Sequence, residues 1–200
     1  TAHIADAQIT AAKIASGSFL VTADGQNNTV VGTNAGDSFS GTDAVDNTLI
    51  GYNAGTAITT GDQNTAVGSY ALDANTTGEK NAAFGMHALG STTTGTQNTG
   101  IGRGALGANT TGSNNTGVGY FAGQQTTTGD NNTAVGMDSF KTNTTGYSNT
   151  ALGKAAMAAN TTGANNVAVG TGALDANTTA GNNTAVGTNA ASSNTTGIET

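Results

Sequence analysis

The sequence predicts an all-β fold, a parallel β-solenoid of about ten 17-residue coils. Three observations support this prediction: a short motif recurs at a fixed interval, its residues alternate in size, and glycines punctuate every copy. The motif is clearest at Asn64-Thr65-Ala66-Val67-Gly68, and the glycine that ends each copy is its closing glycine. The first interval between closing glycines is 51 − 32 = 19 residues and every later one is 17, which is typical of a solenoid. The closing glycines are Gly32, Gly51, Gly68, Gly85, Gly102, Gly119, Gly136, Gly153, Gly170 and Gly187.

The residues just before each closing glycine predict a short strand. Counted from that glycine, position −3 is mostly threonine and position −2 is mostly alanine or glycine, so large and small residues alternate as they do along a strand. Position −1 is always large and apolar, and we expect it to form the structural core of the repeat. Its residues are Val31, Ile50, Val67, Phe84, Ile101, Val118, Val135, Leu152, Val169 and Val186.

Position −4 is asparagine in every copy, and we expect these side chains to form a hydrogen-bonded ladder. In a parallel stack the same position recurs at strand spacing, so identical amides can bond from coil to coil. Ten coils at about 4.8 Å each would give a body roughly 48 Å long. The predicted ladder consists of Asn28, Asn47, Asn64, Asn81, Asn98, Asn115, Asn132, Asn149, Asn166 and Asn183.

The rest of each copy predicts a second extended segment between two glycine corners. From Gly51 onward, positions +8 and +9 are both threonine, as in Thr76-Thr77, and position +10 is usually glycine, as in Gly78. These threonine pairs can form ladders of their own. The small residues at position −2 predict the close approach of a second surface, either a facing wall of the same coil or a neighbouring chain.

The period also divides the chain. Residues 1–25 lie outside the repeat and read as an N-terminal connector or stalk, and residues 26–200 form the β-solenoid repeat domain. Within the connector, alanine-rich flanks favour a short helix around Ala5 to Ala15, while isoleucines at five-residue intervals are compatible with an extended, intertwined trimeric stalk. Both readings remain open from the sequence.

Composition excludes several classes of function. A net charge of −7 argues against nucleic acid as a partner, and no apolar run is long enough to predict membrane insertion. The two histidines, His3 and His87, are far apart, cysteine is absent, and the carboxylates do not recur in phase. We therefore expect no enzyme, no catalytic or cofactor-binding residues and no metal site, with His87 exposed or stacked.

Aromatic residues and core size give two further expectations. Tyr70, Tyr120, Phe121 and Tyr147 fall at different coil positions, so a designed sugar site is not evident. Each repeat carries few large apolar side chains, so stacking of coils, and of chains, must complete the core.

The repeated NTAVG and NTTG segments resemble two related families. Asn64 to Gly68, Asn132 to Gly136 and Asn183 to Gly187 are similar to the repeats of bacteriophage tail fibres and of the heads of trimeric autotransporter adhesins. The likeness covers residues 26–197, and the leader Ile9-Thr10-Ala11-Ala12-Lys13-Ile14-Ala15 resembles a segment common in phage fibres. The adhesin family implies a left-handed β-roll that assembles as a trimer, although its repeat is shorter than 17 residues.

The expected function is therefore structural and adhesive. The resemblance implies a homotrimeric phage tail-fibre segment in the virion that mediates host attachment, with a cell-surface glycan or protein receptor and other fibre or tail proteins as partners. The alternatives are a trimeric bacterial surface adhesin head, an ice-binding solenoid that uses its threonine ladders, and a self-assembling extracellular filament.

Overall fold

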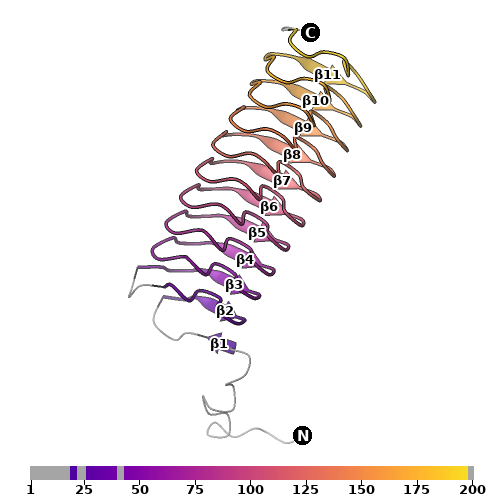
Figure 1. Ribbon diagram of the computed structural model, residues 1–200. Helices are drawn as coiled ribbons and strands as arrows, with labels where there is room; N and C mark the ends of the chain where they lie inside the picture. The colour runs from indigo at the N-terminus through magenta and orange to yellow at the C-terminus, as the bar shows by residue number, and fades with distance from the viewer. Residues whose placement is uncertain (1–18, 22–25, 40–42, 198–200) are drawn as a thin grey trace, which may run out of the picture.

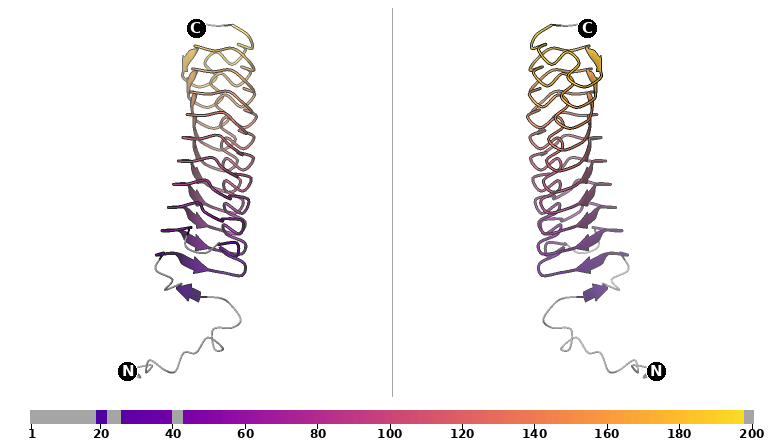
Figure 2. Two further views of the ribbon diagram at one scale, coloured as in Figure 1. Left: turned by 90° about the vertical axis from the view of Figure 1, so that its left-hand side faces the viewer. Right: turned by 90° about the vertical axis from the view of Figure 1, so that its right-hand side faces the viewer.

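The computed structural model describes residues 19–21, 26–39 and 43–197, and these residues form an all-β solenoid (Figure 1). Two side views show the coils stacked along a single axis (Figure 2). Each strand is three residues long, and all eleven belong to one sheet. They are β1 (Phe19–Val21), β2 (Thr29–Val31), β3 (Thr48–Ile50), β4 (Thr65–Val67), β5 (Ala82–Phe84), β6 (Thr99–Ile101), β7 (Thr116–Val118), β8 (Thr133–Val135), β9 (Thr150–Leu152), β10 (Val167–Val169) and β11 (Thr184–Val186).

Neighbouring coils pair in the register that the repeat dictates. Strands β2 to β11 are parallel and follow chain order, with each residue beside its counterpart in the next coil, as Ala66 is beside Ala83. The predicted parallel solenoid is confirmed. The second predicted extended segment is not a strand, because its residues lie in bends and turns. It is still bonded to its neighbours, since the amide N–H of Thr76 donates to the Thr93 carbonyl at 2.9 Å.

The sheet begins before the predicted domain boundary at residue 25. Strand β1 pairs antiparallel with β2, with Leu20 opposite Val30, and so covers the first edge of the parallel ladder (Figure 1). The segment from Ala5 to Ala15, for which a helix or a stalk was expected, lies outside the described residues.

The strands face the opposite way from the prediction. In β2 to β11 the middle residue of each strand, at position −2, is buried, whereas the residues at positions −3 and −1 point outward. Phe84 and Leu152, both predicted core residues, are 41% and 44% exposed, while Ala83 and Ala151 are fully buried. The prediction that position −1 forms the core is therefore wrong for all ten residues, which are half-buried or exposed. They are Val31, Ile50, Val67, Phe84, Ile101, Val118, Val135, Leu152, Val169 and Val186.

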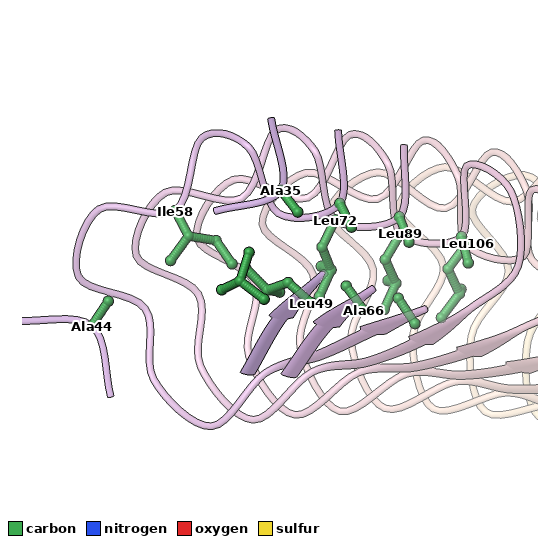
Figure 3. Packing of buried hydrophobic residues seen from close by; sticks show 13 residues of the cluster. Ala35, Ala44, Leu49, Ile58, Ala66, Leu72, Leu89 and Leu106 are labelled. Carbon is green, nitrogen blue, oxygen red and sulfur yellow. The ribbon is translucent and has the colours of Figure 1, made fainter. Parts of the chain in front are cut away.

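Large side chains from the opposite wall explain this reversal. Leu72, Leu89 and Leu106, at position +4, reach across the coil interior toward the strands (Figure 3). They leave room for little more than a methyl group at position −2. At Gly117, an added Cβ would lie 2.8 Å from Cγ of Leu106. The small strand residues therefore face a wall of the same chain, which resolves the alternatives that the sequence left open.

The predicted asparagine ladder is confirmed. From Asn47 to Asn183, each amide N–H at position −4 donates to the side-chain Oδ1 of the asparagine one coil earlier, over 2.8 to 3.0 Å. Each Nδ2 also donates across the coil to a backbone carbonyl, as Asn98 does to Gly112 at 2.9 Å. All ten side chains are buried. The ladder thus provides buried backbone groups with the hydrogen-bond partners that they require.

Glycine is favoured at the two corners for different reasons. The closing glycines have φ between 124° and 140°, a conformation that other residues rarely adopt. Glycines at position +10 have ordinary φ values but lie close to their neighbours, and only Ala180 replaces glycine at this position in the copies from Gly51 onward. An added Cβ at Gly112 would meet Asn109 Oδ1 at 2.5 Å and the Gly129 carbonyl oxygen at 2.6 Å.

Candidate functional site

The outward side of the sheet is a regular surface that runs along the stack. This outer face consists of positions −3 and −1 of β2 to β11, and threonine occupies eight of its ten places at position −3. The face carries no charged residue. It therefore presents a column of hydroxyl-bearing side chains beside a column of apolar ones along the whole stack. Half-exposed apolar rows of this length are typical of interaction surfaces.

Two further threonine columns lie beyond the strands. At position +8 the hydroxyls are tied into the fold, since Thr76 Oγ1 donates to the Thr93 carbonyl at 3.0 Å and Thr110 Oγ1 to the Thr127 carbonyl at 3.0 Å. At position +9 every threonine from Thr60 to Thr196 is exposed. The position +9 residues are Thr60, Thr77, Thr94, Thr111, Thr128, Thr145, Thr162, Thr179 and Thr196.

Aromatic rings gather at the corner that follows β3 to β7, where residues at positions +1 and +2 point outward. Tyr52 and Tyr70 meet edge to face with centroids 5.3 Å apart, and Tyr70 stacks on His87 at 4.9 Å with an interplanar angle of 7°. Further along, the rings of Tyr120 and Phe121 are 4.1 Å apart. These contacts hold the exposed rings in defined orientations.

Cations accompany the second ring pair. The Arg103 guanidinium lies 5.3 Å from the centroid of Phe121, and its Nη1 donates to the Tyr120 hydroxyl at 2.9 Å. The Lys141 ammonium lies 5.7 Å from the Phe121 centroid and 2.9 Å from the Asp138 carboxylate. Such cation–π contacts add to the ordering of the corner.

This gathering was not predicted from the sequence, because its residues are divided between two coil positions, +1 and +2. They are consecutive residues on one corner, so the 17-residue phase brings Tyr52, Tyr70, Tyr120 and Phe121 to the same side of the stack. A search for aromatic residues within one residue of a shared phase would have found them. Tyr147 is exposed but belongs to a different part of its coil.

The described titratable groups near the aromatic corner do not form a cluster. His87 is exposed and stacked on Tyr70, in accordance with the expectation from the sequence. Partial burial raises the pKa of the Asp73 carboxyl above its usual range, while its own and the Ala74 backbone N–H groups and the nearby His87 act in the opposite direction. Folding therefore becomes more favourable as the pH falls through this raised pKa.

Two carboxylates elsewhere in the solenoid accept hydrogen bonds from backbone N–H groups. Asp62 accepts the Val45 N–H at 2.8 Å and Asp130 accepts the Ser113 N–H at 2.7 Å, each joining two successive coils. Within the described residues no group of three or more His, Cys, Asp or Glu side chains lies close enough together to hold a metal ion. His3 lies outside those residues.

Comparison with known proteins identifies no relative of this chain. No family model matches the chain, and neither a curated protein nor a solved structure shows a significant match. Among the described residues there is no helix with the length and apolar character needed to cross a membrane.

Proposed function

We propose that this chain is a structural and adhesive segment of a homotrimeric fibre of the phage tail-fibre type, which acts in the virion at host attachment. The observation that carries the proposal is the outer face of the sheet. Its apolar column at position −1 runs from Val31 to Val186, is half-buried or exposed throughout, and has no charge beside it. A protein with so thin an interior gains stability when such a face is covered.

A second copy of this chain is the best match for that face. The coils of the second copy repeat at the same spacing. The apolar residues of the two outer faces therefore meet over the full length of the stack. Self-complementary, uncharged faces are typical of homo-oligomer interfaces. The number three rests on the resemblance to trimeric fibres and adhesin heads described above. A bacterial surface adhesin head would use the same face, so the assembly test applies to both.

The native mass tests the assembly. Light scattering on the purified chain is expected to give three times the 19.3 kDa of one chain. The variant Val135→Asp places a charge in the middle of the outer face and is expected to yield a folded monomer. The matched control Thr111→Asp adds the same charge at an exposed position +9 and should remain trimeric. A wild-type mass of one or two chains, or a trimeric Val135→Asp variant, would refute this interface.

Adhesion requires a separate experiment. Fluorescently labelled trimers are expected to bind bacterial cells more strongly than the Val135→Asp monomer, because three linked copies raise avidity without new contacts. The Thr111→Asp trimer serves as the control for the added charge. Equal cell binding by the trimer and the monomer would contradict an adhesive role that depends on assembly.

The exposed threonines at position +9 favour ice binding as a second candidate function. Nine of them stand in one column at coil spacing, which forms a regular array of hydroxyl and methyl groups. A thermal-hysteresis measurement decides this candidate. Activity that disappears in Thr111→Tyr and persists in Val135→Asp would favour ice binding, and an absence of hysteresis in the wild type would remove it.

A further inference from the structure

The outward side chains of the aromatic corner are interrupted at one coil. Positions +2 and +5 point to the same side of the stack, and the coil closed by Gly102 has glycine at both, Gly104 and Gly107. The next coil carries Phe121 and Gln124 there, and the preceding coil carries His87 at position +2. At these two positions the coil closed by Gly102 thus has no side chain, whereas the coil after it has two and the coil before it has one.

The resulting notch is a cavity of about 340 Å³. Gly104, Gly107 and Ala108 form its floor, and the side chains that rise around it belong to the neighbouring coils. The volume lies at the lower end of the range for small-molecule sites. Its floor is mostly backbone, so a ligand there can approach the chain closely.

Two rings border the notch in fixed positions. The Phe121 ring edge lies over Gly104, where an added Cβ would be 2.5 Å from its Cδ1 and Cε1 atoms. His87 lines the other side, and its ring is stacked on Tyr70 of the coil before it. Because Tyr70 supports one face of the imidazole, the opposite face is directed along the stack toward the notch.

The remaining lining residues are neutral hydrogen-bonding groups. Gln124 and Gln125 each bring an amide with two N–H donors and one carbonyl acceptor. None of the residues that line the notch is a carboxylate, lysine or arginine, and the two nearby cations, Arg103 and Lys141, lie against the Phe121 ring. The site therefore suits an uncharged ligand that has one apolar face for a ring contact and several hydroxyls for the amides.

From this combination we propose that the notch binds one pyranose ring of a glycan. The C–H face of the sugar would pack on Phe121, and its hydroxyls would bond the two glutamine amides and the imidazole. The source of the sugar, a host cell surface, rests on the proposed function, but sugar binding itself does not. The notch lies past the corner from the outer face, so trimer formation through that face leaves it open.

Sugar binding is tested by NMR titration of the full chain with methyl pyranosides of glucose, galactose, mannose and N-acetylglucosamine. At least one of them is expected to produce saturable shifts in the ring signals of Phe121 and His87, with a dissociation constant in the millimolar range. Failure of all four to shift either ring would overturn the proposal.

Variants locate the binding. Ala108→Gln installs the residue that the next coil has at the same position, Gln125, and should fill the notch and weaken binding at least tenfold. Ala159→Gln is the matched control, since Ala159 occupies position +6 three coils later, and it should bind as the wild type does. Equal binding by both variants would place the sugar elsewhere and overturn the assignment.

A second variant removes the ring without filling the cavity. Phe121→Ala should weaken binding at least tenfold and should fold, because Ala155 already occupies this coil position with φ 55°, against 54° at Phe121. Retained binding in Phe121→Ala, with the melting temperature of the wild type, would exclude the proposed ring contact.

The outcomes separate this proposal from the proposed function. A trimer that adheres to cells equally well with and without Ala108→Gln, and whose ring signals do not respond to pyranosides, retains the adhesive function and refutes the notch. A monomer that binds a pyranoside at Phe121 and His87 supports the notch and refutes the fibre assembly.

Discussion

Each asparagine of the ladder bonds in two directions at once. Asn98 Oδ1 accepts the amide N–H of Asn115 in the next coil, and its Nδ2 donates to the Gly112 carbonyl across the coil. A neutral amide has its acceptor and its donors on two separate atoms, whereas a carboxylate has no donor and a hydroxyl has its donor and acceptors on a single oxygen. This explains why position −4 never varies. The sequence predicted the ladder, but not the bond that each Nδ2 makes across the coil to a backbone carbonyl.

Loss of one ladder residue should therefore be costly. Asn98→Ala leaves the buried N–H of Asn115 and the Gly112 carbonyl without these partners, and we expect it to lower the free energy of unfolding by about 2–4 kcal/mol. Asn114→Gly, at an exposed position with φ 59°, is the control and should be close to neutral. Urea melts compare the two. A loss below 0.5 kcal/mol in Asn98→Ala, as for ordinary surface changes, would mean that the ladder contributes little.

At the scale of the strand, the sequence predicted the alternation and the parallel register but not the direction of each face. Size alone favoured the valines at position −1 for the interior. The interior is instead filled by long side chains at position +4, such as Leu72 and Leu106, and these accept only alanine or glycine opposite them in most coils. Which face of the strand is buried depends on the distance between the two walls of a coil. The order of residues along the chain does not contain that distance.

A pair of adjacent substitutions in β8 tests the orientation. Ala134→Asp puts an unpaired carboxylate into the interior, where Ala134 is 1% exposed, and we expect a loss of more than about 4 kcal/mol or failure to fold. Val135→Asp adds the same group on the outer face and should leave the coil fold intact by circular dichroism. If Val135→Asp unfolded the protein and Ala134→Asp did not, the orientation of the strand would be reversed.

At the scale of the whole molecule, the repeat interval predicted that the coils stack, but it did not predict the aromatic corner. Ladder bonds, strand pairs and leucine contacts all join a coil to its immediate neighbours. Stability in such a protein is close to a sum over coils and the interfaces between them. The notch beside Phe121 depends on three coils together, so no single copy of the repeat contains its signal.

Removal of one complete coil should be tolerated. Deletion of residues 120–136, a full 17-residue unit, places the residues after Gly136 in the register of the lost coil, and we expect a folded protein with a slightly lower melting temperature. Deletion of residues 120–135 removes one residue fewer, so the residues after the deletion are displaced by one position in the repeat. We expect this variant to be strongly destabilised. Thermal melts by circular dichroism compare both with the wild type. Similar melting of the two deletions would contradict a register fixed by the ladder.

The constant offset of the ladder also has a consequence for how such genes change. Ladder partners from Asn47 onward are 17 residues apart, which corresponds to 17 × 3 = 51 nucleotides, a whole number of codons. Misaligned recombination between copies of the repeat therefore keeps the reading frame and the hydrogen-bond partners together. Each event would lengthen or shorten the particle by one rung of about 4.8 Å. The length of such a protein can thus evolve in small equal steps, without passing through unfolded intermediates.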